Sequence, residues 1–199
     1  MLSPELARIA QETGYSNLKS MYFLHNLVKN INPDCVLELG TYLGGSAAYM
    51  ASAIKEGGVV VSIDSRGQLS LMKLDLDVPN RNIELCGLTD KLFFVEGSTF
   101  CVSELLVGFP MKPEIVFMDA SHDLEGLWKE YRSLAPLLPE NHVIVIDDIW
   151  PEVCEFVFQL LKQYPFCLTI KDFHQGMAVL CTHSEYLTKI SDAIRDAHD

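Results

Sequence analysis

Short apolar runs alternate with segments of helical spacing along most of this chain, and this alternation constrains the fold more than any other feature. Strands buried on both faces of a parallel sheet form continuous apolar runs, and parallel strands need long crossovers that are usually helical. The alternation therefore predicts a doubly wound α/β sheet. Five runs are expected to form parallel strands: 35–39, 59–63, 92–95, 114–118 and 143–146.

The segments between and after these runs predict the remaining elements. Helical spacing indicates helices over 46–56, 125–138 and 151–164. The last begins with proline, which is favoured in a first helical turn. Beyond it, two apolar segments, 166–174 and 176–181, are expected to pair as a terminal hairpin.

No repeat, low-complexity tract or linker divides the sequence, so a single domain over residues 1–199 is expected. Within it we expect an N-terminal helical cap over 1–32, a core over 33–183 and a final helix or tail over 184–199.

The cap is expected to contain two helices, over 3–13 and 17–30, with Ser3 capping the first. These helices could cover a ligand cleft or simply protect an edge of the sheet. The apolar stretch MYFLHNLV, residues 21–28, could serve the interface of a homodimer.

Charge and composition exclude several classes of partner. The chain has 27 acidic and 15 basic residues, a formal net charge of −12, which has the wrong sign for binding nucleic acid. It has no long apolar stretch and no signal-peptide pattern, so we expect no membrane partner and a cytoplasmic location. The six cysteines are scattered, which favours buried, reduced thiols.

The stretch VLELGTYLGGSAAYM predicts a strand, a glycine turn and a helix. The spacing of Gly40 and Gly44 departs from the dinucleotide fingerprint, and Glu38 would repel a phosphate. A carboxylate at Glu38 suits a cationic ligand, and Asp64 after the second strand could accept hydrogen bonds from ribose hydroxyls. Together they indicate a nucleoside site without a phosphate clamp; the alternative is that both acids only cap loops.

This stretch resembles the first motif of class I S-adenosylmethionine-dependent methyltransferases. The resemblance implies a Rossmann-like sheet of seven strands, the last antiparallel, with helices on both faces. It also implies that the glycine turn lies against the methionine part of the cofactor, Asp64 against the ribose and VEGST near the adenine. The implied cofactor residues are Glu38, Gly40, Gly44, Ser46, Asp64, Gly97, Ser98 and Asp119.

Three carboxylates follow the fourth and fifth predicted strands. Asp119 follows one, and Asp147 and Asp148 follow the next. Neighbouring parallel strands end at the same edge of a sheet, about 4.8 Å apart, so these acids should converge. Such a group favours a hard divalent cation, for which we expect Mg²⁺. Alternatively, either member of the acidic pair could cap the helix near Pro151, and Asp119 or Ser121 the helix near 123.

The segments VFMDASHDLEG and VIVIDDIW resemble metal-dependent small-molecule O-methyltransferases, most closely the sugar and macrolide branch and more distantly the catechol and caffeoyl-CoA branch. In the latter the third metal ligand is usually Asn, where this chain has Asp148. His122 falls where that branch carries a lysine base, and histidine could take a proton at neutral pH. A solvated loop histidine is the alternative, and Asp123 is a second candidate base.

The expected function is metal-assisted transfer of a methyl group from S-adenosylmethionine to a hydroxyl of a small-molecule acceptor. Two alternatives stay open: an NAD-dependent oxidoreductase on a similar sheet, and a non-catalytic cofactor-binding module with the same fold. Trp150, just after the acidic pair, is expected in the core or at a hinge, or in the lining of a pocket.

Overall fold

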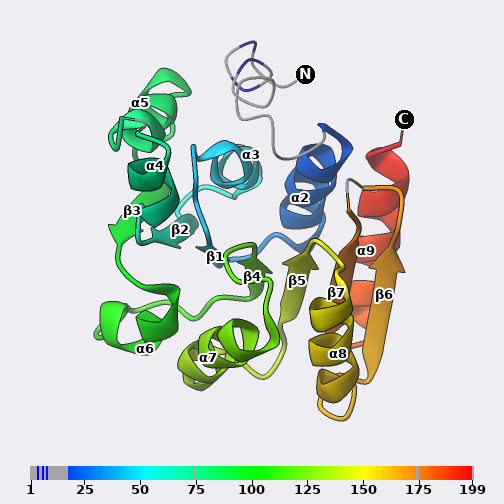
Figure 1. Ribbon diagram of the computed structural model, residues 1–199. Helices are drawn as coiled ribbons and strands as arrows, with labels where there is room; N and C mark the ends of the chain where they lie inside the picture. Colours follow the sequence, from blue (N-terminus) through cyan, green and yellow to red (C-terminus); the bar gives the residue numbers. More distant parts are fainter. Residues whose placement is uncertain are drawn as a thin grey trace.

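A computed structural model describes residues 4, 6, 8, 18–73, 75–173 and 175–198. Within these residues a seven-stranded sheet has the strand order β3-β2-β1-β4-β5-β7-β6 (Figure 1). The strands are β1 Cys35–Leu39, β2 Val59–Asp64, β3 Leu92–Glu96, β4 Ile115–Met118, β5 Val143–Asp147, β6 Phe166–Ile170 and β7 Met177–Cys181.

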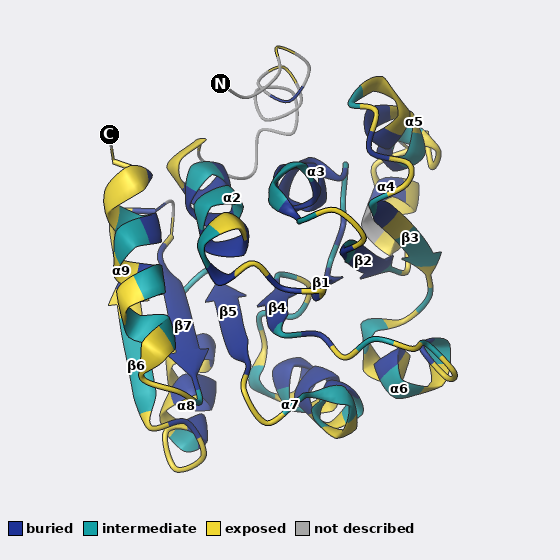
Figure 2. Cartoon of the chain, turned by 180° about the vertical axis from the view of Figure 1, so that it is seen from behind, coloured by how far each residue is buried: buried dark blue, intermediate teal, exposed yellow. Residues whose placement is uncertain are grey.

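The pairing of the strands confirms the predicted fold class. Strands β1 to β5 are parallel, whereas β7 is antiparallel to both of its neighbours, β5 and β6. Every residue of β1, β4, β5 and β7 is buried, as their largely apolar sequences predict, while the edge strands β3 and β6 include exposed residues (Figure 2).

Helices cover both faces of the sheet because strand side chains alternate between the faces. Val36 packs into one core with α2, α3, α5 and α9, and Leu37 packs into a second core with α6, α7 and α8 (Figure 1). The helices are α2 Leu18–Ile31, α3 Gly45–Ala53, α4 Gly67–Leu71, α5 Val78–Leu85, α6 Val102–Leu105, α7 Leu124–Leu134, α8 Pro151–Leu160 and α9 Glu185–Asp196, with 3₁₀ turns η1 Thr99–Cys101 and η2 Ala135–Leu137.

The boundaries differ from the predicted ones in ways that matter for the site. Strands β2 and β5 each run one residue further than expected, so Asp64 and Asp147 are the last residues of their strands. Helix α7 ends at Leu134 rather than at 138, and a 3₁₀ turn that contains a proline follows it. Helix α8 ends at Leu160 rather than at 164. The short helices α4, α5 and α6 were not predicted, because each is shorter than the window of about 11 residues over which apolar spacing identifies a helix.

Helix α2 packs on a face of the sheet, between α3 and α9, and lies along neither edge strand. The apolar residues of its 21–28 segment that are most buried, including Phe23 and Leu27, pack inside the chain. Internal packing therefore explains the apolar stretch that suggested an interface, and a homodimer stays a prediction. The helix expected over 3–13, with its Ser3 cap, lies outside the described residues apart from positions 4, 6 and 8.

All six cysteines are free thiols, as expected, but Cys101 and Cys154 are exposed rather than buried. Both lie near the start of short or amphipathic helices, where one face meets solvent. No helix in the described part of the chain is long and apolar enough to cross a membrane.

Candidate active site

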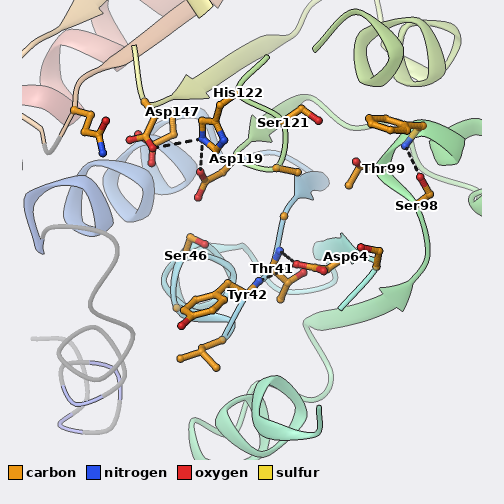
Figure 3. Close-up of a pocket in the computed structure, with 18 of the residues that line it drawn as sticks. Thr41, Tyr42, Ser46, Asp64, Ser98, Thr99, Asp119, Ser121, His122 and Asp147 are labelled. Carbon is orange, nitrogen blue, oxygen red and sulfur yellow. Dashed lines mark hydrogen bonds and ion pairs between the residues drawn. The ribbon is translucent and has the colours of Figure 1, made fainter. Parts of the chain in front are cut away.

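A pocket of about 580 Å³ lies at the carboxyl ends of the parallel strands (Figure 3). In doubly wound sheets ligands bind at this edge, beside the point where the strand order reverses, and volumes of about 300 to 1,000 Å³ suit small molecules. The pocket is lined from α2, from the ends of β1 to β5 and from the β6–β7 turn; its predicted members are Gly40, Ser46, Asp64, Ser98, Asp119, His122, Asp147 and Asp148.

Asp64 holds the glycine turn that follows β1. Its Oδ2 atom accepts hydrogen bonds from the backbone N–H groups of Thr41 (2.8 Å) and Tyr42 (3.0 Å), and its Oδ1 atom accepts one from the N–H of Arg66 (2.5 Å). A carboxylate has about four acceptor positions, so roughly one is left for a ligand hydroxyl. Asp64 both shapes the turn and faces the pocket.

Gly40 allows this turn to pass close to the next strand loop. Its φ of +96° lies in the region that favours glycine, and a Cβ atom at this position would overlap the carbonyl group of Asp119. The Asp119 N–H donates to the carbonyl of Leu39 at 2.9 Å, which extends the β1–β4 pairing to this point. The two loops therefore meet at the floor of the pocket.

Glu38 lies beneath the pocket rather than in its lining. Its side chain is fully buried, and its two oxygens accept hydrogen bonds from the hydroxyls of Ser46 and Ser62. Burial raises the pKa of this carboxyl to about 8, although the two serine donors oppose the shift. Glu38 thus anchors the start of α3 to β1, and Ser46, which does line the pocket, is one of its donors.

Two predicted glycines also lie outside the lining. Gly44 precedes α3 with φ +82° and forms its N-cap, while Gly97 packs against the side chain of Leu105, where a Cβ atom would lie 2.6 Å from Leu105 Cδ1. Their backbone positions serve the turn and the packing of α6.

The other end of the pocket is acidic. His122 Nε2 lies 3.7 Å from Asp119 Oδ1 and 3.4 Å from Asp148 Oδ2, so the imidazole sits between two carboxylates (Figure 3). The interaction with Asp119 raises the pKa of His122 most, and the charges of Asp148 and Glu130 add to it against the opposing effect of burial. The neighbouring carboxylates therefore favour the protonated form of the imidazole.

Asp147 is the most buried acid of this end, at 6% exposed. Burial raises its pKa well above the ordinary value, and the charges of Asp119 and Asp148 add to that rise. Its Oδ1 atom is buried and makes no hydrogen bond within the described residues. Asp148 follows with φ +53°, a left-handed conformation that Asp tolerates better than most residues.

Helix capping does not account for these acids. The N-cap of α7 is Asp123, whose Oδ1 atom accepts from the Gly126 N–H at 2.9 Å. Helix α8 begins after Trp150 without a side-chain cap. The cap alternatives for Asp119, Ser121, Asp147 and Asp148 are therefore wrong, and Asp123 is engaged as a cap and is absent from the pocket lining.

The donor chemistry fits a hard cation, since an orphaned carboxylate oxygen of Asp147 lies among further carboxylates. The side chains are not already gathered around one point, however. Across residues 18–73, 75–173 and 175–198, no group of three or more His, Cys, Asp or Glu is arranged to hold a metal ion.

A model of a methyltransferase domain family matches residues 37–149, more than half of the chain, from within β1 to just after β5. The chain belongs to this methyltransferase family. The match spans the glycine turn, Asp64, Asp119, His122 and the acidic pair, and it confirms the expected family. It favours methyl transfer over the oxidoreductase alternative. No curated protein matches the sequence.

Solved structures show that the methyltransferase fold extends beyond the matched residues. An O-methyltransferase from Bacillus cereus, in complex with S-adenosylhomocysteine, is 18% identical, with 92% of each chain covered and a TM-score of 0.73. The O-methyltransferase TomG from Streptomyces achromogenes, involved in tomaymycin synthesis and solved with S-adenosylmethionine, is 17% identical over 92% of each chain, with a TM-score of 0.71. A methyltransferase from Geobacter sulfurreducens is 17% identical over 91% of this chain and 90% of that one, with a TM-score of 0.70.

Several lining residues of this methyltransferase were missed by the sequence analysis. Thr41 and Tyr42 adjoin Gly40, so the turn motif could have indicated them, whereas Met21 and Gln175 reach the pocket only because α2 and the β6–β7 turn fold over it. Trp150, 48% exposed, lines the pocket, which decides among the three readings that the sequence left open.

Proposed function

We propose that this protein transfers a methyl group from S-adenosylmethionine to a hydroxyl oxygen of a small molecule. One observation carries the proposal: a single pocket joins a nucleoside-type end, formed by the glycine turn and Asp64, to an acidic end with a histidine. The family assignment and the cofactor complexes of similar folds support it.

At the first end, the backbone of the Gly40 turn offers close approach to the methionine part of the cofactor, and the remaining acceptor position of Asp64 suits a ribose hydroxyl. Ser98 and Phe100 lie where β3 ends, beside the expected adenine. No phosphate needs to be bound, which agrees with the acidic character of the site.

At the second end, His122 is the proposed base. Its imidazole takes the proton of the acceptor hydroxyl, the oxygen forms a bond to the methyl carbon, and the carbon–sulfur bond breaks with its electron pair left on sulfur. The products are a methyl ether, S-adenosylhomocysteine and a protonated His122. Asp119 and Asp148 orient the imidazole and stabilise its positive charge. Positioning within one pocket supplies much of the rate.

Asp119, Asp147 and Asp148 are the residues that would hold a divalent cation, for which we propose Mg²⁺. Bound there, the cation would lower the pKa of the acceptor hydroxyl and offset the mutual repulsion of the carboxylates. The orphaned Oδ1 atom of Asp147 supports this assignment.

The acceptor is proposed to be uncharged or cationic rather than anionic. No Lys or Arg is among the described residues that line the pocket, whereas four aspartates are. A phosphate or carboxylate on the acceptor would find no Lys or Arg side chain to pair with it there, and four aspartates would repel it. Trp150 and Met21 offer apolar surface to its remainder.

Calorimetric titration with S-adenosylhomocysteine tests the proposal first, because this product binds without knowledge of the acceptor. Micromolar affinity, about −8 kcal/mol, is expected. Asp147→Ala should keep that affinity and lose methyl transfer to hydroxylated acceptors in the presence of Mg²⁺. Folded protein without affinity for S-adenosylhomocysteine would overturn the cofactor assignment. An Asp147→Ala variant that still transfers methyl groups would overturn the metal assignment.

A further inference from the structure

Glu130 on α7 is a charged side chain with no exposed surface that lies just outside the pocket lining. Its Oε2 atom is buried without a hydrogen-bond partner among the described residues, and burial raises the pKa of its carboxyl. An acid in such a place costs stability that an apolar side chain of similar length would not. Packing alone therefore does not explain a glutamate here.

The other carboxylate oxygen joins two separate walls of the pocket. Glu130 Oε1 accepts a hydrogen bond from Thr99 Oγ1 at 2.7 Å and one from Ser121 Oγ at 2.8 Å. Thr99 belongs to η1, just after β3, and Ser121 lies between β4 and α7; both line the pocket (Figure 3). Glu130 Oε1 therefore bridges the pocket wall at Thr99, beside the proposed adenine site, and the pocket wall at Ser121, which precedes His122.

Helix α7 fixes the His122 loop at two further points. Asp123 caps the helix through the N–H of Gly126, and a Cβ atom at Gly126 would lie 2.8 Å from Ser121 Cβ and Oγ. Ser121 is therefore pressed against α7, and it directly precedes His122. Its hydrogen bond to Glu130 therefore ties the residue that precedes His122 to α7.

We infer that Glu130 is a positioning residue that couples the cofactor wall at Thr99 to the base loop at Ser121. The inference rests on the proposed function, in which these two walls bind the cofactor and carry the base. Glu130 touches neither ligand directly. Its charge also raises the pKa of His122, so a neutral variant that keeps the hydrogen bonds is needed to separate positioning from charge.

Three variants test the coupling. Glu130→Met keeps the length of the side chain and removes both acceptor bonds. Glu130→Gln keeps an amide oxygen that can accept from both hydroxyls. Glu125→Met, on the exposed side of the same helix, is the control. The readouts are the Kd for S-adenosylhomocysteine by calorimetry, the imidazole NMR signals of His122 assigned by their loss in His122→Asn, and the Tm.

Glu130→Met should weaken S-adenosylhomocysteine binding by about two- to tenfold, the loss expected for one or two hydrogen bonds, and should also shift the His122 signals. Glu130→Gln should restore both readouts, and Glu125→Met should change neither. A Glu130→Met variant with altered Tm but unchanged Kd and His122 signals would overturn the inference. Wild-type protein that fails to bind S-adenosylhomocysteine would instead remove the proposed function, and the His122 signals would still decide whether Glu130 positions the loop.

Discussion

The backbone of Gly40 passes so close to Asp119 that a Cβ atom on Gly40 would overlap the Asp119 carbonyl group. This contact joins the loops after β1 and β4, which carry the two ends of the pocket. Gly40 also has φ +96°, a conformation that alanine avoids.

Gly40→Ala should therefore lower the free energy of unfolding by about 2 to 4 kcal/mol, because it combines backbone strain with overpacking. Gly57→Ala is the matched control, since Gly57 has φ +77° but no atom within 4 Å of its Cβ position. Gly57→Ala should lower the free energy of unfolding by only about 1 kcal/mol. Urea unfolding measures both, and equal losses would mean that the contact with Asp119 adds nothing.

Asp147→Asn should stabilise the protein while removing a proposed metal ligand. Its pKa is raised in the folded state, so the folded protein keeps a proton that the unfolded chain releases above pH 3.8. The carboxylate therefore costs stability from about pH 4 upward. At pH 8 with a chelator present, Asp147→Asn should be more stable by about 1 kcal/mol or more in chemical denaturation.

Asp90→Asn provides the comparison for this effect, because Asp90 is exposed. Its stability should match the wild type within about 0.5 kcal/mol. If Asp147→Asn were less stable than the wild type at pH 8, the carboxylate would be making favourable contacts.

Glu38→Gln should become increasingly favourable as the pH rises. The folded pKa of about 8 exceeds the ordinary 4.5, so wild-type stability contributed by this group is complete below pH 4.5 and falls until about pH 8. Glutamine does not titrate. The difference in unfolding free energy between variant and wild type should grow by up to about 1.4 kcal/mol per pH unit in that window and then level off.

Denaturant unfolding at pH 5, 7 and 9 measures this difference. Glu56→Gln, at an exposed position, should show a difference that stays flat. A flat difference for Glu38→Gln as well would mean that Glu38 is ionised in the folded protein throughout this range.

His142 should make the protein sensitive to mild acid far from the pocket. Its Nε2 atom accepts from the Tyr164 hydroxyl at 2.8 Å, its Nδ1–H donates to the Pro139 carbonyl at 2.7 Å, and burial lowers its pKa. Such a group contributes its full stability above pH 6.5 and loses it as the pH falls toward the folded pKa.

The wild type should lose up to about 1 kcal/mol more than His142→Gln between pH 7 and pH 5.5, in unfolding experiments at the two pH values. His183→Gln, which changes an exposed histidine, should behave like the wild type. Identical losses in the wild type and His142→Gln would show that another group is responsible.

The acidic end of the pocket could be foreseen because it depends on local pattern. Asp119, Asp147 and Asp148 each follow a buried apolar run, and parallel strands place such residues at one edge. The position of Asp64 at this edge could be predicted from the same rule. The hydrogen bonds that Asp64 accepts from Thr41 and Tyr42 could not be predicted, because they depend on the conformation of the glycine turn beside the end of β2.

The sequence by itself determined the order of the strands and longer helices, the parallel sheet and the edge at which the candidate site lies, because apolar runs and a glycine turn are encoded by neighbouring residues. Only the tertiary structure decided what each acid does. Glu38 is buried because the β1–β2 register sets it opposite Ser62 and α3 brings Ser46 above it, and Glu130 meets Thr99 and Ser121 because α7 packs beside both loops. Such roles depend on contacts between residues far apart in the chain, whose register and packing no local pattern specifies.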